Sequence, residues 1–383
     1  MAHQLRGASA AVGVGIAGQG EAPGFNSMEL LVEAAHSALD DAGLSVSDVD
    51  GLFGNTAVHG MPSMSIAEYM GIRPGFSNAS NIGGSSFVAH CLGAALAIEA
   101  GLCEVALIAY GSNQRTAGGK LVSVSEPAPY EAVYGPRYPI SAYALAAARH
   151  MHEYGTTKTH LAEVAVAARS WAAMNPEAFT RDPITIEDVL SARMVSDPLG
   201  RLDCCLVTDG GAAVVMTSAA RAKDCNQAPV YLLGAGMAHW HRVISQMPDL
   251  TVTAASDSGP RAFEMAGMKP DDIDVLELYD AFTINPILFL EDLGFCKKGE
   301  GGDFVSGGRI APGGDLPVNT NGGGLSCVHP GMYGLYTVIE AVRQLRGACE
   351  ERQVKDAKVG LAHGNGGVLS SQVTSIWGTG ETL

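Results

Sequence analysis

The sequence is short of charged residues, and of basic residues above all. Of its 383 residues only 17% are charged, and 24 lysines and arginines stand against 40 aspartates and glutamates, which gives a formal net charge of −16 at pH 7. A chain this acidic is not attracted to phosphate backbones or to anionic lipid surfaces. We therefore expect no nucleic-acid partner and no membrane partner. Binding of a phosphorylated ligand would have to be confined to a local basic patch.

The sequence also lacks metal, disulfide and membrane patterns. Its eight cysteines contain no C-x-x-C pair, and no histidines, cysteines and carboxylates recur at metal-ligand spacing, so we expect no metal site and no disulfide framework. This cysteine usage predicts a reducing, cytoplasmic location. No apolar run has the length that crosses a bilayer. Glycines break the apolar run within residues 1–18, which has no clear cleavage site, so we expect no signal peptide.

What the chain has instead is a large hydrophobic fraction, 47%, and an internal duplication. Residues 38–52 (ALDDAGLSVSDVDGL) match residues 262–276 (AFEMAGMKPDDIDVL) without a gap. Each segment is typical of the end of an amphipathic helix, followed by a glycine cap, a turn and a buried strand. Two more matches follow in the same order and pair 81–88 with 321–328 and 104–111 with 358–365. This order predicts two α/β halves of similar fold.

Each half contains an apolar helix that follows a glycine-rich turn. We predict these helices at residues 85–98 and 325–339, and neither contains a formally charged residue. A helix that is apolar on all sides belongs inside a protein. Packing the two helices against each other gives five layers in the order α, β, α, β, α. We assign residues 1–222 to the N-terminal half and residues 223–383 to the C-terminal half.

A region of different composition interrupts the first half. Residues from about 113 to 195 contain prolines, tyrosines and most of the scattered basic residues, and a strongly apolar strand pattern returns only at residues 202–218. An insertion of this length in one half only is typical of a functional element. We predict an inserted loop domain that covers the site.

Four motifs, taken with the duplication, resemble the thiolase superfamily. They cover almost the whole chain in the family's order: LDCCLVTDGGAAVVMTS (202–218), ELYDAF (277–282), LPVNTNGGGLSCVHPGMYG (316–334) and LAHGNGG (361–367). Within the superfamily, the sequence is similar to the sterol-carrier-protein-type thiolases and to the thiolase-like acyl-CoA aldolases of steroid side-chain degradation.

The resemblance implies a five-layered αβαβα fold, a homodimer, and an acyl-CoA substrate bound under the inserted region. Coenzyme A is then part of the substrate, and no separate cofactor is implied. The resemblance also implies a small partner protein with a zinc ribbon and an OB-fold. The coenzyme phosphates would meet the basic residues of the insertion, which are Lys120, Arg137, Arg149, Lys158, Arg169 and Arg181.

The sequence departs from family thiolases where they carry a nucleophilic cysteine, at the start of the first buried helix. Gly84 stands at that place, Ser85 and Ser86 follow it, and Cys91 lies two turns deeper. A serine at a helix start is an N-cap or a nucleophile, and a hydroxyl needs a base to become nucleophilic. We predict that Gly84 and Ser85 form an oxyanion turn that binds the thioester.

The remaining family positions supply proton-transfer groups. Tyr279 stands where many thiolases have asparagine or histidine, His329 matches the histidine that hydrogen-bonds the thioester oxygen, and His363 takes the place of a second, acid/base cysteine. The resemblance implies that these three residues are catalytic. Asp280 and Tyr333 are secondary candidates.

A polar turn completes the candidate site. It contains Asn319 and Asn321, which we assign to thioester binding. An oxyanion turn combined with a tyrosine and histidines, but without the cysteine, favours enolate chemistry over acyl transfer.

We therefore predict retro-aldol cleavage of a 3-hydroxyacyl-CoA to an aldehyde or ketone and a shorter acyl-CoA, with Tyr279 or His363 as the base. Two alternatives stay open, namely a β-ketothiolase that uses a serine and a non-catalytic acyl-CoA-binding subunit. The sequence does not define the acyl group.

Overall fold

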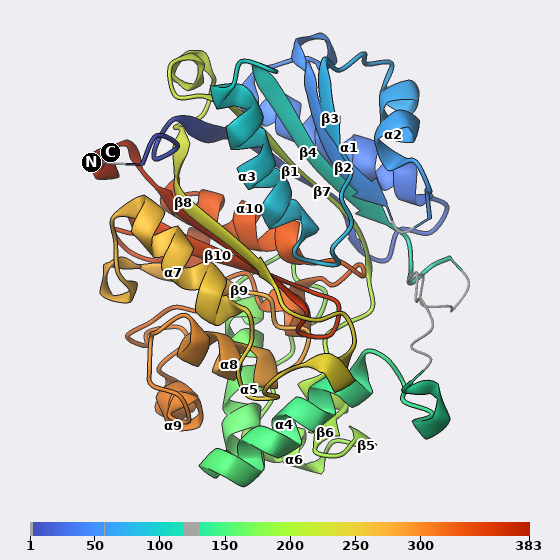
Figure 1. The fold of residues 1–383 in the computed structure, drawn as a ribbon, viewed down its shortest axis with the longest axis vertical. Coiled ribbons are helices and arrows are strands. Elements are labelled where there is room, and N and C mark those ends of the chain that lie inside the picture. The colour runs from blue at the N-terminus through green and yellow to red at the C-terminus, as the bar shows by residue number, and fades with distance from the viewer. Residues whose placement is uncertain (1–2, 57, 118–129) are drawn as a thin grey trace.

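The structure is a computed structural model that describes residues 3–56, 58–117 and 130–383. Within these residues, nine strands form one large sheet in the order β3-β2-β4-β7-β1-β8-β11-β10-β9 (Figure 1). The strands are β1 (Ser9–Gly20), β2 (Gly51–Thr56), β3 (Phe76–Asn78), β4 (Val105–Ser112), β7 (Asp209–Ser218), β8 (Val230–His239), β9 (Val275–Leu278), β10 (Val359–Gly366) and β11 (Ser371–Gly378).

The sheet repeats the internal duplication of the sequence. From the middle outwards, the first half has the order β1-β7-β4-β2 and the second half has the order β8-β11-β10-β9. The pairing directions match as well: β2 is parallel to β4 as β9 is to β10, and β1 is antiparallel to β7 as β8 is to β11. The two halves join where β1 and β8 pair antiparallel.

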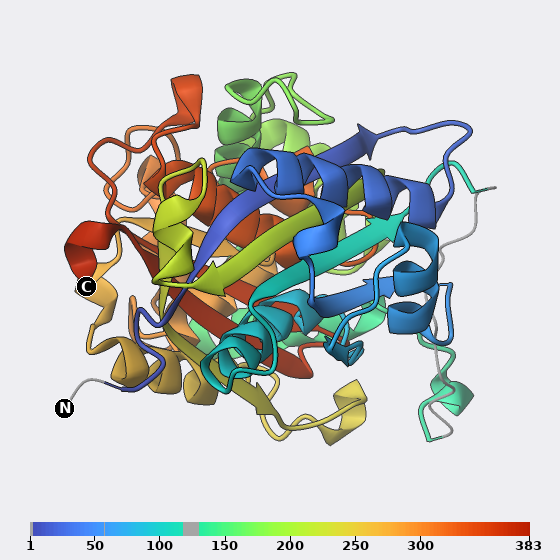
Figure 2. The same ribbon diagram turned by 90° about the horizontal axis from the view of Figure 1, so that it is seen from above.

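The helices form three layers, and the two halves of the sheet lie between them as two β layers. The two outer helices are α1 (Ser27–Ala42), which packs on β1, β7 and β4, and α7 (Ala255–Ala266), which packs on β8 and β11. Between the halves lie α3 (Ser86–Glu99) and α10 (Gly334–Leu345), which contact each other and strands of both halves (Figures 1 and 2). The five-layered order α, β, α, β, α expected from the sequence is confirmed.

Equivalent helix ends explain why the two outer helices stop where they do. Gly43 after α1 and Gly267 after α7 both adopt the left-handed conformation, with φ of 72° and 65°. A glycine reaches this conformation without a steric penalty and ends the helix by binding its last carbonyl groups.

One element boundary differs from the sequence prediction. The second central helix begins at Gly334 rather than at Leu325, because Gly323–Cys327 forms a separate single turn and residues 328–333 form a loop before α10. This loop carries His329.

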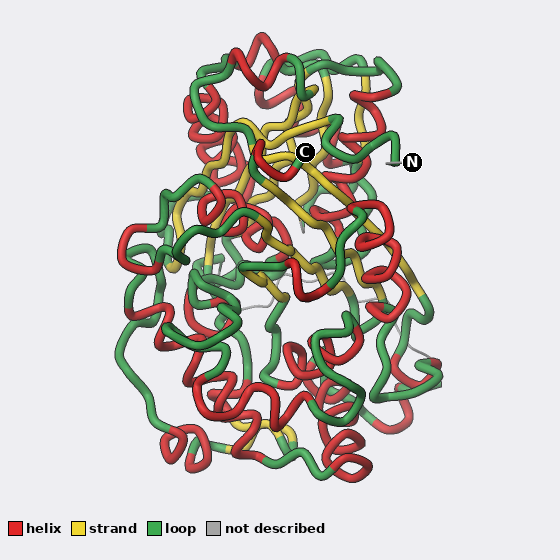
Figure 3. Tube along the Cα trace, turned by 90° about the vertical axis from the view of Figure 1, so that its left-hand side faces the viewer, coloured by secondary structure: helices red, strands yellow, loops and turns green. Residues whose placement is uncertain are grey.

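The remaining elements gather at one end of the sheet, which is the lower part of Figures 1 and 3. Here the inserted region packs beside the segment that follows β9. The inserted elements are α4 (Ile140–Tyr154), α5 (Lys158–Ala173), α6 (Ile186–Ser191), β5 (Met194–Ser196) and β6 (Leu199–Gly200); the others are α8 (Ile284–Asp292) and α9 (Gly301–Val305). At the opposite edge, α2 (Pro62–Met70) packs on β2. Among the described residues, no helix is long and apolar enough to cross a membrane.

Candidate active site

Tyr279 is buried and lies directly after β9. Its backbone N–H donates to the carbonyl of His363 in the neighbouring strand β10 at 3.1 Å, which fixes the strand end. The phenol oxygen lies 3.0 Å from Nε2 of His329 and accepts a hydrogen bond from the backbone N–H of Tyr333 at 3.1 Å. The phenol oxygen accepts the bond from Tyr333 with a lone pair, so its single proton can be donated to Nε2 of His329.

The ring of Tyr279 lies against Gly84, just before the start of α3. A Cβ atom placed on Gly84 would lie only 2.5 Å from both Cζ and Oη of Tyr279. Carbon and oxygen atoms need about 3.5 Å between them. Tyr279 therefore occupies the space that a side chain at residue 84 would need, and the two exclude each other in this arrangement.

The two serines after Gly84 have committed hydroxyl groups. Ser85 Oγ donates to the carbonyl of Ile82 at 3.0 Å and lies 2.8 Å from Oγ of Ser371. Ser86 Oγ donates to the carbonyl of Gly83 at 2.6 Å. Neither hydroxyl is hydrogen-bonded to a histidine or carboxylate among the described residues, so no base is placed to activate a serine. The side chain of Ser85 does not cap α3 either.

Backbone contacts hold His329 in place. Its N–H donates to Oγ1 of Thr208 at 3.0 Å, and its carbonyl accepts from Nε2 of Gln114 at 2.8 Å. Burial lowers the pKa of His329 to about 4 and raises the pKa of Tyr279 well above its ordinary value. At neutral pH, a neutral phenol therefore faces a neutral imidazole, which is a pair that can pass a proton without carrying a charge at rest.

His363 does not join this pair. In β10 alternate residues face opposite sides of the sheet, and it is Gly364 that faces the start of α3, since a Cβ there would lie 2.9 Å from Cα of Ser85. The imidazole of His363 packs on Phe289 in α8, with 4.5 Å between ring centroids.

Both ring nitrogens of His363 are used for structure. Nε2 lies 2.9 Å from Oε1 of Gln372, which only accepts, so Nε2 carries the proton. Nδ1 then accepts from Oγ1 of Thr374, also at 2.9 Å. Burial lowers the pKa of His363 to about 4. We therefore regard His363 as a structural residue and take Tyr279 and His329 as the acid/base candidates.

The side-chain oxygens of the two predicted asparagines accept hydrogen bonds within the protein and hold the segments that carry the tyrosines. Asn319 Oδ1 accepts from the N–H of Leu278 in β9 at 2.6 Å. Asn321 Oδ1 accepts from the N–H of Gly323 at 2.7 Å and from the hydroxyl of Tyr333 at 2.9 Å. The polar turn thus fixes Tyr333, whose N–H binds Tyr279.

Asp280 has a similar supporting position. Its carboxylate accepts from the N–H groups of Gly324 and Leu325 at 2.6 and 3.3 Å and so anchors the turn at 323–327. Burial raises the pKa of Asp280 to about 7. Its contacts link the segment after β9 to the turn before His329.

Of the basic residues predicted to meet a coenzyme phosphate, Arg169 has another role. It is only 6% exposed, and it donates to Oγ of Ser326 and to the carbonyl of Asp182, each at 2.9 Å. Arg149 pairs with Glu153 on the same helix. Lys120 lies outside the described residues.

The structure adds residues that sequence reasoning missed. Thr208 and Gln114 hold the His329 loop, and the ring of Tyr143 of α4 packs at a tilt on Phe282 with 4.4 Å between ring centroids. Thr208 lies in the motif at 202–218 that resembles the thiolase superfamily, so this motif could have marked it as a candidate site residue. Gln114 and Tyr143 lie in the insertion, where no periodicity or spacing marks them.

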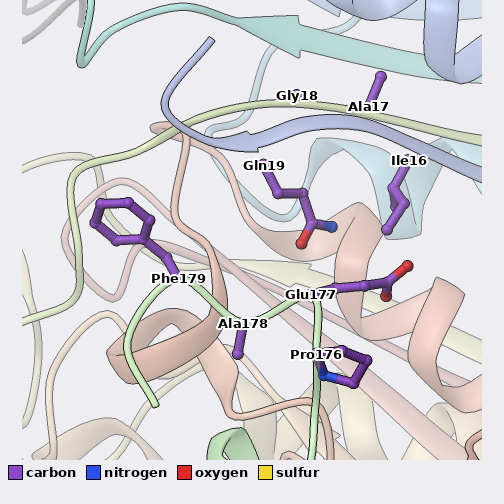
Figure 4. Close-up of a pocket in the computed structure, with 8 residues that line it drawn as sticks. All are labelled: Ile16, Ala17, Gly18, Gln19, Pro176, Glu177, Ala178 and Phe179. Atoms are coloured by element: carbon purple, nitrogen blue, oxygen red, sulfur yellow. The ribbon is translucent and has the colours of Figure 1, made fainter. Parts of the chain in front are cut away.

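One pocket of the structure is lined by residues outside the candidate site. Figure 4 shows its eight residues, which come from the end of β1 (residues 16–19) and from the segment after α5 (residues 176–179). None of the predicted site residues is among them. Within the part of the chain that the structure describes, no group of three or more histidines, cysteines and carboxylates is arranged to hold a metal ion.

The duplicated five-layered fold, with a histidine and a tyrosine meeting at the start of a central helix, defines the class of protein. The family model "Thiolase C-terminal domain-like" matches residues 236–379. Over 96% of this chain and 98% of the relative, the sequence is 36% identical to an acetyl-CoA acetyltransferase of Methanothermobacter thermautotrophicus. It is 35% identical to the 17-hydroxy-3-oxo-4-pregnene-20-carboxyl-CoA lyase of Mycobacterium tuberculosis, over 90% of this chain and 92% of the relative.

A solved structure agrees with these relatives. The Ltp2-ChsH2(DUF35) aldolase superposes with a TM-score of 0.90 and 33% identity, and the match covers 99% of this chain and all of that one. The chain belongs to the thiolase superfamily. Its relatives include both acyltransferases and C–C lyases, so the site has to distinguish between the two activities.

Proposed function

We propose that this protein is a thiolase-like aldolase, which cleaves a 3-hydroxyacyl-CoA to an aldehyde or ketone and a shorter acyl-CoA. The observation that carries the proposal is that Tyr279 fills the space in front of Gly84, where family thiolases hold their nucleophile, and lies 3.0 Å from His329. A proton-transfer pair therefore occupies the place where family thiolases have their nucleophile.

The pair can remove the proton of the 3-hydroxyl group without a charged intermediate on tyrosine. The hydroxyl proton moves to the phenol oxygen of Tyr279 while the phenol proton moves to Nε2 of His329. The oxygen lone pair forms the carbonyl of the leaving aldehyde or ketone, and the electrons of the Cα–Cβ bond form the enolate of the shorter thioester. The proton on His329 then returns through Tyr279 to Cα.

The enolate oxygen needs hydrogen-bond donors. We assign this role to the N–H groups of Gly84 and Ser85, which lie at the positive end of α3. Coenzyme A enters as part of the substrate, and the mechanism requires no other cofactor. The alternative of a β-ketothiolase is supported by the relatives named as acetyl-CoA acetyltransferases. Against it stand the two serine hydroxyls, which bind backbone carbonyls and have no base.

We also propose two partners. The first is a protein of the DUF35 kind, by analogy with the matched aldolase. The second is another copy of this chain, at the edge strand β3 beside α2. Two methionines of this region, Met61 and Met64, are each 67% exposed, and the outer edge of β3 pairs with no strand of the described chain. The eight free cysteines support a reducing, cytoplasmic location.

The experiment that tests the function offers the purified protein, with and without a DUF35 partner, either a 3-hydroxyacyl-CoA alone or a 3-oxoacyl-CoA with free CoA. Aldehyde or ketone release from the first substrate without free CoA supports the aldolase. Cleavage of the 3-oxo substrate only, and only with free CoA, contradicts it. Absence of any turnover, with acyl-CoA binding retained, indicates a binding subunit.

A further inference from the structure

Two buried glutamates approach one hydroxyl group beside the site. Glu277 lies in β9, two residues before Tyr279, and Glu340 lies in α10. Oε1 of each carboxyl is 2.8 Å from Oγ1 of Thr320. Glu277 and Thr320 are fully buried, and Glu340 is 2% exposed. Because these groups are buried and in direct contact, their hydrogen bonds have to be satisfied among themselves.

The number of protons around Thr320 decides the state of one carboxyl. Oγ1 of Thr320 accepts a hydrogen bond from Nε2 of Gln344 at 2.9 Å, and the hydroxyl has one proton to donate. The hydroxyl can donate that proton to Glu277 or to Glu340, but not to both. Oε1 of each glutamate nevertheless lies at hydrogen-bond distance from Oγ1 of Thr320. The second short contact requires a proton on a carboxyl group, and Thr320 then accepts it.

The neighbours of the two carboxyls show which one holds the proton. Glu340 accepts from Nε and Nη2 of Arg352 at 2.9 and 3.1 Å, as an ionised carboxylate does. Burial alone would raise the pKa of Glu340, but the guanidinium holds it below its ordinary value. Glu340 is therefore the ionised partner.

Glu277 is bonded to no cation in the described structure. The charged or titratable groups around it are Glu340 and Tyr333 from α10 and the turn before it, Asp280 after β9, and Cys349. Burial first, and then the charge of Glu340, raise its pKa well above the ordinary value. Its Oε2 has no hydrogen-bond partner among the described residues, which is costly for a buried carboxylate and far less so for a neutral acid.

We propose that Glu277 is a positioning residue that keeps its proton at neutral pH and donates it in a hydrogen bond to Thr320. The bond fixes residues 317–321 beside β9, where the N–H of Thr320 also reaches Glu277 Oε1 at 3.2 Å. The same segment holds Tyr333 through Asn321, and the N–H of Tyr333 binds the phenol of Tyr279. Glu277 thus acts on the site through a short chain of contacts and does not touch the substrate.

An infrared experiment tests the protonation directly and needs no enzymatic activity. The difference spectrum between the wild type and Glu277→Gln at neutral pH is expected to show the carbonyl band of one protonated carboxylic acid, lost in the variant. Glu33→Gln on the exposed face of α1 is the matched control and is expected to leave this band unchanged. A difference spectrum for Glu277→Gln that shows only the bands of an ionised carboxylate overturns the proposal, whether or not the protein is an aldolase.

A stability experiment gives an independent reading. Above the ordinary pKa of glutamate and below the raised pKa of Glu277, the folded protein holds one proton more at this residue than the unfolded chain, so its stability falls as pH rises. Relative to Glu277→Gln, the unfolding equilibrium constant of the wild type is expected to rise about tenfold per pH unit in this window. Parallel pH profiles of the two proteins contradict a protonated Glu277.

The effect on the site is read from kinetics and rests on the proposed aldolase function. Glu277→Gln keeps a neutral group that donates to Thr320, and we expect it to retain the wild-type kcat. Glu277→Ala removes the donor and is expected to lower kcat about tenfold or more with little change in KM, because Tyr279 loses its alignment. Equal loss of kcat in both variants, in folded protein, contradicts the positioning role.

Discussion

Replacing Gly84 by alanine tests the space that the site reserves for Tyr279. The new Cβ would lie 2.5 Å from Cζ and Oη of Tyr279, against about 3.5 Å for an ordinary contact, so the phenol has to move by about 1 Å. This shift breaks the 3.0 Å contact with His329. A displacement of this size in a proton-transfer group costs about a hundredfold in rate. We expect kcat for cleavage of a 3-hydroxyacyl-CoA to fall by that factor.

The control lies in α3, the helix that begins just after Gly84. Gly93→Ala brings a Cβ to 3.3 Å from the ring of Phe53 and within 4 Å of no atom of Tyr279, so we expect unchanged kcat. In a Tyr279→Phe background, Gly84→Ala should add much less to the loss, because both changes remove the same interaction. Wild-type kcat in folded Gly84→Ala would refute the reasoning.

Four further results are expected. Tyr279→Phe should lower aldol cleavage about a hundredfold, measured as aldehyde or ketone release, because the relay loses its proton. Gly84→Cys should show no CoA-dependent thiolysis of a 3-oxoacyl-CoA, because the thiol and Tyr279 compete for one space; thiolysis at a thiolase rate would contradict this. His363→Ala should cost about 1–3 kcal/mol of unfolding free energy, measured with urea, because Gln372 and Thr374 lose their partner; a kcat loss without destabilisation would restore it to the mechanism. Burial lowers the pKa of His329 and of His363 to about 4, so each should remove about 1.4 kcal/mol of stability per pH unit as pH falls from about 6.5 towards 4, relative to His329→Gln or His363→Gln; parallel pH profiles of wild type and variant in urea unfolding would contradict neutral histidines.

The sequence was sufficient for the fold because its signals repeat. The helix, glycine cap and strand at 38–52 and at 262–276 predict the same unit twice, and the structure has that unit as α1 with β2 and as α7 with β9. Tyr279, Asp280 and His329 were found because they lie in motifs that resemble a known family. Gly84 was found because it stands at the start of the first central helix, where family thiolases carry a nucleophilic cysteine.

Other features depend on details that the sequence does not carry. The side of the sheet on which the imidazole of His363 lies depends on the register of β10, because a shift of one residue moves a side chain to the opposite side. The start of α10 depends on a turn at 323–327 that Asp280 anchors from a distant part of the chain. The protonation of Glu277 follows from a contact with Thr320 across 43 positions of sequence.

The proposal of non-covalent cleavage is tested most directly by the mass of the intact protein, quenched during turnover of a 3-hydroxyacyl-CoA that is being converted to aldehyde or ketone. With Tyr279 in front of Gly84, we expect only the mass of the unmodified chain while product accumulates. An acyl adduct that forms and decays at the rate of turnover, mapped to Ser85, Ser86 or a cysteine, would contradict it.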